Sequence, residues 1–154
     1  MPLPMIRPAR ADDYDETAQV WMNGWVSTGL AYSSPVLLAN LRARIGREME
    51  RGWSLFVADD RGSLAAMLAL HLPTAYLDQM FVAPEYQGRN LGRRLLAFTR
   101  ERLPLEIQLR CARENERAWR WYEREGFVFE KQAVEPTTGL TMKYYRWTRE
   151  GAVQ

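Results

Sequence analysis

The chain has 154 residues, of which 47% are hydrophobic and 26% charged, and its formal net charge is +2. This length is typical of one domain with one core, so we expect a single domain over residues 1–154. The apolar fraction excludes a disordered chain. The net charge is too small to indicate a nucleic-acid-binding protein by itself, because such binding depends on the neutralisation of many phosphates.

Cysteine and hydropathy patterns indicate the compartment. Cys111 is the only cysteine, so no intrachain disulfide can form. No stretch approaches the roughly 18 apolar residues of a membrane helix, and the N-terminus turns acidic where a signal peptide has its apolar segment. We therefore expect a cytoplasmic protein. We expect no metal site, because the chain lacks a Cys/His cluster, and we expect the single histidine, His71, to be a polar residue near a strand end.

Hydrophobic periodicity predicts four helices and seven strands. In chain order the expected elements are a strand at 5–9, a helix from 12 or 13 to 24 or 28, a helix from 34 or 35 past 45, strands at 53–59, 63–72 and 75–82, a helix through 91–98, a strand at 105–111, a helix at 114–125, and strands at 127–134 and 140–147. This order predicts an α+β fold, with a mixed sheet and helices on its faces.

Particular residues mark the expected ends of helices. Asp12 and Asp13 can cap the first helix through their side-chain oxygens. Ser34 before Pro35 predicts the start of the second helix. Gly126 is expected to end the last helix, because glycine readily adopts the left-handed conformation that follows many helices.

Arginines are concentrated in one part of the chain. Only Lys131 and Lys143 are lysines, whereas ten arginines lie from Arg89 to Arg124. This concentration suggests an anionic ligand. The glutamates among these arginines instead favour a solvated helix face for most of them.

The stretch PEYQGRNLGRRLL, residues 84–96, reads as a loop that opens into a helix. The first backbone N–H groups of a helix lack intrahelical partners, and the helix dipole adds positive potential, so such a loop can bind an anion. Gly88 and Gly92 permit a positive φ and a close approach of phosphate oxygens. On spacing alone, an ordinary capped helix start is the alternative.

A family resemblance favours the anion site. Residues 81–96 resemble the acyl-CoA pyrophosphate loop of the GNAT superfamily, the acetyl-CoA-dependent N-acetyltransferases, whose pattern is Gln or Arg, two residues, Gly, one residue, and Gly or Ala. Gln87 and Gly92 match the outer positions, and Asn90 replaces the middle glycine. Among the residues other than glycine, asparagine best tolerates the left-handed conformation, so we expect the turn to form. The replacement of glycine by asparagine can weaken the binding of the cofactor. A nucleotide P-loop is excluded, because no Gly-Lys-Ser/Thr follows.

A second segment, NERAWRWYEREGF, resembles a later helix of the same superfamily. The matching residues are Asn115, Ala118, Tyr122, Gly126 and Phe127. Asn115, Trp119 and Tyr122 follow one helical stripe and can face one ligand. In isolation this helix would favour Tyr122 as a core aromatic.

The resemblance implies a GNAT-like fold, with a mixed, mostly antiparallel central sheet flanked by helices on both faces. It also implies transfer of an acetyl group from acetyl-CoA to a primary amine by direct attack in a ternary complex, without a metal. Tyr122 is then the general acid, and the backbone of Met80, Phe81 and Val82, together with Asn115, holds the pantetheine arm. The residues implied for the pyrophosphate are Gln87, Gly88, Arg89, Asn90, Leu91, Gly92 and Arg93.

Asp78 is the candidate for handling the proton of the amine, because many family members carry a carboxylate at or near this position. Side-chain alternation predicts that Asp78 shares a strand face with Tyr76, Met80 and Val82. It would act through water or by attracting the ammonium group. The alternative is a purely structural hydrogen bond to the neighbouring strand.

The acceptor is poorly specified by the sequence. The resemblance implies that the first two helices and residues 27–33 form one wall of the acceptor site and that the closing strands form another. Trp25, Tyr32, Trp53 and Tyr76 are candidate lining residues, and each fits a core position equally well. A small amine, an amino acid and a peptide N-terminus are all compatible.

Two other classes of function remain as alternatives. The first is a non-catalytic acyl-CoA-binding module, in which Asn90 reflects lost chemistry. The second is a nucleic-acid-binding domain that uses the arginine-rich helices, with steeply salt-dependent binding. We expect acetyl-CoA and an amine as partners, with neither nucleic acid nor membrane, and a homodimer is compatible with such a fold.

Overall fold

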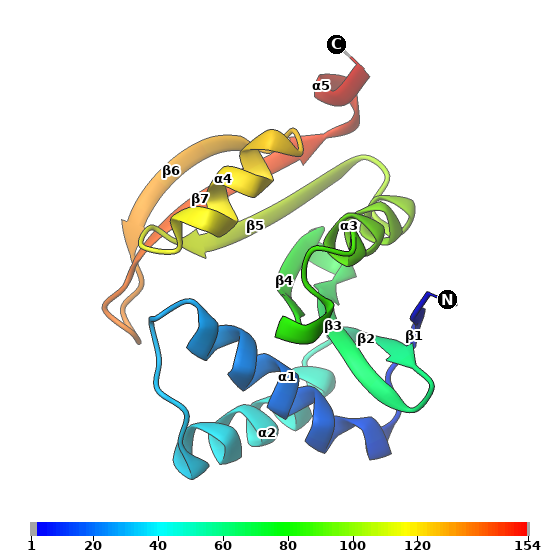
Figure 1. Cartoon of the computed structure of the whole chain (residues 1–154). Helices are drawn as coiled ribbons and strands as arrows, with labels where there is room; N and C mark the ends of the chain where they lie inside the picture. The colour runs from blue at the N-terminus through cyan, green and yellow to red at the C-terminus, as the bar shows by residue number, and fades with distance from the viewer. Residues whose placement is uncertain (1–2, 154) are drawn as a thin grey trace.

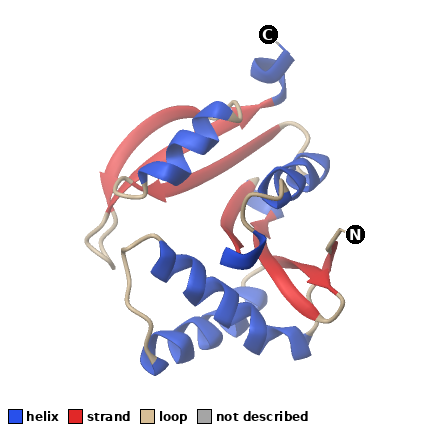
Figure 2. Cartoon of the chain, viewed as in Figure 1, coloured by secondary structure: helices blue, strands red, loops and turns tan. Residues whose placement is uncertain are grey.

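The helices and strands follow the chain order expected from the sequence (Figures 1 and 2). The computed structural model describes residues 3–153. The strands are β1 (Met5–Pro8), β2 (Ser54–Asp60), β3 (Ser63–His71), β4 (Tyr76–Val82), β5 (Glu106–Ala112), β6 (Val128–Val134) and β7 (Thr141–Thr148). The α-helices are α1 (Tyr14–Ser27), α2 (Pro35–Glu50), α3 (Leu91–Arg102), α4 (Glu116–Arg124) and α5 (Arg149–Val153), and the 3-10 turns are η1 (Ala11–Asp13), η2 (Leu72–Thr74) and η3 (Pro84–Tyr86).

The seven strands form one sheet in the order β1-β2-β3-β4-β5-β7-β6. Every neighbouring pair is antiparallel except β4 and β5, which are parallel. The predicted α+β fold, with a mixed and mostly antiparallel sheet, is therefore confirmed. Helix α5 was not predicted, because its five residues are too few to produce a hydrophobic period.

The parallel pair β4 and β5 is joined at one end only. Tyr76 pairs with Gln108, and no residue further along either strand is paired across this junction. Beyond Tyr76 the two strands diverge, and Figure 1 shows them running apart. The backbone of β4 therefore lacks a neighbouring strand on this side for most of its length.

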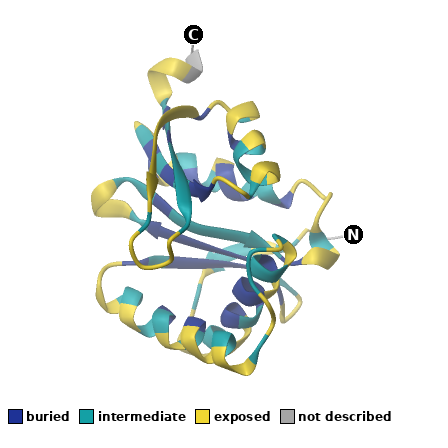
Figure 3. Ribbon diagram, turned by 90° about the vertical axis from the view of Figure 1, so that its left-hand side faces the viewer, coloured by how far each residue is buried: buried dark blue, intermediate teal, exposed yellow. Residues whose placement is uncertain are grey.

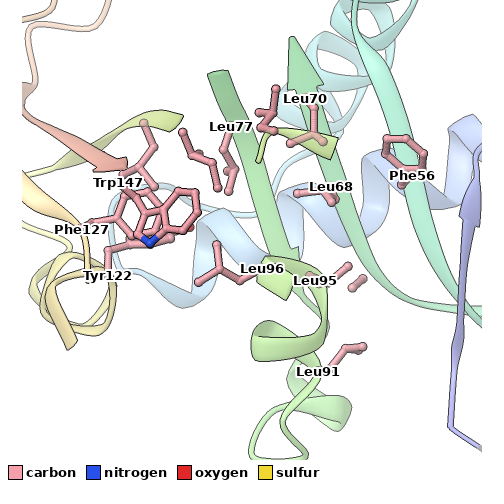
Figure 4. Close-up of a cluster of buried hydrophobic side chains, with 14 of the residues drawn as sticks. Phe56, Leu68, Leu70, Leu77, Leu91, Leu95, Leu96, Tyr122, Phe127 and Trp147 are labelled. Atoms are coloured by element: carbon pink, nitrogen blue, oxygen red, sulfur yellow. The ribbon is translucent and has the colours of Figure 1, made fainter. Parts of the chain in front are cut away.

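Two hydrophobic clusters cover the two faces of the sheet. One lies under α1 and α2 and includes Trp21 and Ile45. The other lies under α3 and α4 and includes Leu95, Leu96 and Tyr122 (Figure 4). Burial is concentrated in the central strands, whereas the edge strand β6 is exposed throughout (Figure 3). The prediction of helices on both faces is confirmed.

Two of the predicted helix ends are confirmed. The Ser34 hydroxyl accepts a hydrogen bond from the backbone N–H of Leu37 at 3.0 Å and caps α2. Gly126 has a φ of +97°, and the N–H of Phe127 donates to the carbonyl of Tyr122 at 3.0 Å, which ends α4.

The prediction that Asp12 and Asp13 cap the first helix through their side chains is wrong. Asp13 occupies the N-cap position of α1 without a side-chain bond to that helix. Its carboxylate instead accepts from the backbone N–H of Arg10 at 2.7 Å and pairs with Arg7 at 2.8 Å. These donors precede α1 in the chain: Arg7 belongs to β1, and Arg10 comes directly before η1.

Within residues 3–153 there is no helix that combines the length and the apolar composition needed to span a bilayer.

Candidate active site

Two cavities open beside the divergence of β4 and β5. The first, the loop cavity, has a volume of about 720 Å³ and is lined by residues 86–88 and 90–93 around the start of α3, by residues of α4, and by Met80, Phe81 and Val82 of β4. The second, the helix cavity, has a volume of about 610 Å³ and is lined by α1, α2, β4, β5 and the β6–β7 turn. The residues that line both cavities are Met80, Phe81, Asn115, Ala118 and Tyr122. The cavities therefore meet between β4 and α4.

The loop before α3 has the backbone of an anion site. Gly88 and Asn90 both have a positive φ, of +79° and +61°, so the predicted tolerance of Asn90 for the left-handed conformation is confirmed. No side chain caps α3, unlike α2. The first bond of the helix joins the N–H of Arg94 to the carbonyl of Asn90 at 3.1 Å, so the N–H groups of the three preceding residues have no intrahelical acceptor.

Not every expected loop residue takes the expected position. Gly92 is helical, without a positive φ, and a Cβ there would lie 3.6 Å from the ring of Trp121, an ordinary contact distance. The Arg89 guanidinium lies 5.3 Å from the ring centroid of Tyr86, and Arg89 does not line the cavity. Gln87, Gly88, Asn90, Leu91, Gly92 and Arg93 do line it.

Asn90 allows a matched test of the loop. A valine at φ +61° is strained by about 1–2 kcal/mol, so we expect Asn90→Val to weaken acetyl-CoA binding by roughly tenfold. We expect Asn90→Gly to preserve or tighten binding, because glycine adopts this backbone freely. Calorimetric titration measures both, and Asn40→Val on the exposed side of α2 is the control. Equal affinities in the Val and Gly variants would contradict a role for the left-handed turn.

The backbone of β4 presents free polar groups to the junction of the cavities. The N–H of Ala83 donates to the carbonyl of Ala65 on β3 at 2.8 Å. Because backbone groups alternate in direction along a strand, those of Met80 and Val82 face away from β3, toward the side that β5 has left. Gln87 donates from its side chain to the carbonyl of Val82 at 3.2 Å. The backbone of Phe81 faces β3, and its side chain lines both cavities.

Tyr122 lies where the cavities meet. Its residue exposure is 8%, and its ring packs edge-on against Trp121 at a centroid distance of 5.0 Å. It packs in the same way against Phe127, at 5.4 Å (Figure 4). Burial raises the pKa of the phenol well above its usual value of 10. The hydroxyl is therefore protonated at neutral pH, as a proton donor must be.

Asn115 and Tyr122 share the cavity-facing side of α4, but Trp119 does not. The cavity-lining stripe is Asn115, Ala118 and Tyr122. Trp119 instead donates from its indole N–H to the carbonyl of Arg113 at 2.9 Å, and Lys143 Nζ lies 3.3 Å from its ring centroid. The predicted ligand-facing position of Trp119 is therefore wrong.

A register shift in β4 changes the position of Asp78. Gln79 pairs with Ala69 and Leu77 pairs with Leu70, which leaves Asp78 as an extra residue. Leu77 consequently packs in the same core cluster as Met80. The prediction that Asp78 shares a face with Met80 by simple alternation is wrong, because the shift reverses the alternation.

The carboxylate of Asp78 lines the helix cavity and already has two partners. It accepts a hydrogen bond from the indole N–H of Trp53 at 2.7 Å and pairs with Arg110 at 3.3 Å. These partners come from the turn before β2 and from β5. Asp78 thus links three segments of the chain at the cavity wall.

Of the aromatic residues considered for the acceptor, only Trp25 lines a cavity. Its ring packs edge-on against Phe81 at 6.5 Å. Tyr32 is 91% exposed and lines neither cavity. Trp53 is buried, and Tyr76 lies 5.4 Å from the guanidinium of Arg110. Neither Tyr32 nor Tyr76 therefore lines either cavity.

Sequence reasoning missed two arginines of α2 and the arginine directly after it. Arg44, Arg47 and Arg51 line the helix cavity. Their spacing of three and four residues puts them on one helical side, a signal that the sequence contains. The pattern does not reveal that this side faces a cavity, because the packing of α2 against the sheet decides that.

Cys111 also lines the helix cavity, and burial raises the pKa of its thiol to about 12. Because the thiolate is the reactive form, we expect a disulfide reagent at pH 8 to react with the native protein at least about 100-fold more slowly than with free cysteine. Unfolding in guanidinium should expose one thiol per chain. Rapid reaction of the folded protein would contradict this burial.

No cluster of three or more His, Cys, Asp or Glu side chains that could hold a metal occurs among the described residues. His71 contacts the hydroxyl of Thr74 at 2.7 Å and lines neither cavity. The arginine-rich segment is largely engaged within the fold. Arg100, for example, donates to the carbonyl of Glu125, and Arg120 pairs with Glu116.

Residues 18–127 match the model of the Acetyltransferase (GNAT) family. The chain therefore belongs to the GNAT family and is an N-acetyltransferase, an acyltransferase whose family uses acetyl-CoA. The resemblance inferred from the two sequence motifs is confirmed. No curated protein sequence is significantly similar to this chain.

Solved structures share the fold at low sequence identity. A GNAT-family protein from Desulfovibrio desulfuricans has a TM-score of 0.76 and 19% identity, with 94% of this chain and 98% of that chain covered. The PaiA N-acetyltransferase from Thermoplasma acidophilum, in complex with coenzyme A, has a TM-score of 0.71 and 19% identity over 96% and 99%. A chimera of the spermidine N-acetyltransferase SpeG from Vibrio cholerae and hSSAT has a TM-score of 0.68 and 22% identity over 97% and 99%.

Proposed function

We propose that this N-acetyltransferase joins acetyl-CoA and a primary amine in one ternary complex, with direct attack of the amine on the thioester. The observation that carries the proposal is the meeting of two cavities at Tyr122 and the free backbone of β4. The loop cavity takes acetyl-CoA, and the helix cavity takes the amine. The reacting atoms then lie at the junction.

The residues of the loop cavity can bind the successive parts of acetyl-CoA, from the pyrophosphate to the pantetheine arm. The uncapped start of α3 offers backbone N–H groups to the pyrophosphate, and the guanidinium of Arg93, which pairs with Glu125 at 3.2 Å, lines the same cavity. The backbone of Met80 and Val82 can pair with the amides of the pantetheine arm, as a strand would. Asn115 lies across from them on α4.

Acetyl-CoA supplies an acetyl group activated as a thioester, whose sulfur leaves as the amine attacks. A free N–H of β4 stabilises the oxyanion that develops on the carbonyl, an interaction that often contributes about 2.7–4 kcal/mol to catalysis. The amine attacks in its neutral form and loses one proton to water as the C–N bond forms, while Tyr122 donates its proton to the sulfur as the C–S bond breaks and regains a proton from water.

For Asp78 we propose a positioning role, since its carboxylate is already bonded to Trp53 and Arg110. We expect Asp78→Asn to lower kcat/KM by a similar factor at every pH. The decrease of kcat/KM toward low pH, its acidic limb, should persist in the variant. A profile of kcat/KM between pH 5 and 10 measures this. Disappearance of the acidic limb in the variant would instead make Asp78 the group that takes the ammonium proton.

The acceptor remains a small amine, an amino acid or a peptide N-terminus in this proposal. Some of the similar structures are spermidine N-acetyltransferases, but their identities of 22% or less support the fold alone. Cytoplasmic location, a single domain and a homodimer stay predictions.

Turnover distinguishes the enzyme from the non-catalytic acyl-CoA-binding module. The experiment incubates the protein with acetyl-CoA and a panel of amines, and follows thiol release together with the mass of each amine. We expect a gain of one acetyl group on at least one amine, matched by released CoA. Tight acetyl-CoA binding without any acetylated product would favour the module.

A further inference from the structure

The charged side chains of the helix cavity are unevenly partnered. Four arginines and three carboxylates line it: Arg44, Arg47, Arg51, Arg110, Glu48, Asp78 and Glu135. Each carboxylate has a partner within the fold, whereas two of the arginines have no carboxylate among the described residues. This difference bears on the charge of the ligand that the cavity can accept.

Two of the carboxylates are paired with arginines. Glu48 lies 3.6 Å from Arg51, one turn along α2, and Asp78 lies 3.3 Å from Arg110. Within each pair, the positive and negative charges cancel. They leave neither a free carboxylate for a cationic ligand nor a free guanidinium for an anionic one.

The third carboxylate belongs to the turn between β6 and β7. The oxygens of Glu135 accept hydrogen bonds from the backbone N–H groups of Thr137 and Thr138, at 2.9 and 2.8 Å. These bonds lower the pKa of Glu135 to about 2. Its charge is therefore present at neutral pH, but it is directed at its own turn.

Arg44 and Arg47 remain. The guanidinium of Arg44 lies 5.2 Å from the ring centroid of Trp21, and within the described residues it makes no ion pair or side-chain hydrogen bond. Arg47 makes no ion pair or side-chain hydrogen bond within the described part of the chain. A cavity wall focuses the field of such charges on its contents.

The two ends of the cavity differ in position and chemistry. Helices α2 and α4 lie on opposite sides of the molecule in Figures 1 and 3. The arginines therefore lie away from Tyr122, and the apolar residues Trp25 and Phe81 also line the cavity.

We propose that the acceptor is a small amine that also carries an anionic group, a carboxylate in the simplest case, bound by Arg44 and Arg47. The inference rests on the proposed transfer reaction and adds the substrate class. The amine lies at Tyr122, an apolar segment crosses the middle, and the anion meets the guanidiniums of α2. A polyamine would place its second ammonium group against these same arginines.

The test compares amines that differ only in charge. Glycine, 4-aminobutanoate, 6-aminohexanoate and phenylalanine are each paired with the primary amide of the same skeleton, and spermidine represents the polycations. For the best-fitting skeleton we expect kcat/KM of the acid to exceed that of its amide by at least tenfold, with spermidine lower still. In Arg47→Gln, and more so in Arg44→Gln/Arg47→Gln, this ratio should fall toward one. Arg149→Gln, which lines neither cavity, should keep the wild-type ratio.

A binding measurement separates this inference from the transfer reaction. Calorimetry in the presence of CoA titrates the N-acetylated acids and N-acetylated amides into wild-type protein and into Arg47→Gln. Tighter binding of the acids, lost in the variant, supports the anionic acceptor even if no turnover is found. Equal or better turnover of amides or spermidine, or no preference for the acids in binding, would overturn the inference and leave acetyl transfer standing.

Discussion

Replacing Tyr122 by phenylalanine should lower kcat by about 10²–10⁴-fold, the range typical of general acid catalysis. The variant keeps the ring that packs against Trp121 and Phe127, so the fold and the loop cavity remain. Acetyl-CoA affinity should therefore change less than twofold. Steady-state kinetics with a saturating amine and calorimetry with acetyl-CoA measure the two quantities separately.

Tyr32→Phe is the matched control, because Tyr32 is 91% exposed and lines neither cavity. It should leave both kcat and affinity unchanged. If Tyr122→Phe turns over at the wild-type rate, then Tyr122 does not donate the proton. If affinity for acetyl-CoA falls with kcat, then the tyrosine acts mainly in binding.

Gly24→Ala should destabilise the protein by about 1–3 kcal/mol, the cost typical of overpacking. A Cβ on Gly24 would lie 2.3–2.9 Å from three side-chain atoms of Phe81, including its Cβ, so the ring and part of β4 must shift. Because Phe81 lines both cavities, turnover should fall as well. Urea unfolding at fixed protein concentration gives the stability change.

Gly46→Ala is a control with the opposite sign. A Cβ on Gly46 has no heavy atom within 4 Å, and the residue lies inside α2. Alanine should therefore stabilise the helix by about 0.5–1 kcal/mol, the difference in helix propensity. Destabilisation by both substitutions, to a similar degree, would contradict the close contact between Gly24 and Phe81.

Local sequence signals predicted most of the fold. Periodicity located the four longer helices and all seven strands, and Ser34 and Gly126 marked helix ends, because these features depend on neighbours in the chain. The loop before α3 was also recognisable, since Asn90 and Gly88 are the residue types that a left-handed backbone selects.

Features set by tertiary contacts were not predictable in the same way. The extra residue at Asp78 arises from the pairing of β4 with β3, and a period-two pattern in one strand contains no trace of it. Tyr32 follows α1 closely in sequence, yet its side chain points to solvent rather than into a cavity. The arginines of α2 reach the helix cavity only because that helix packs across the sheet, so their role appeared with the structure.

The most direct test of the loop cavity as the acetyl-CoA site, on which the proposed reaction depends, is calorimetric titration of the wild-type protein with acetyl-CoA. We predict saturable binding of acetyl-CoA with one site per chain. No binding at millimolar acetyl-CoA would contradict the assignment of the loop cavity, and with it the proposed reaction.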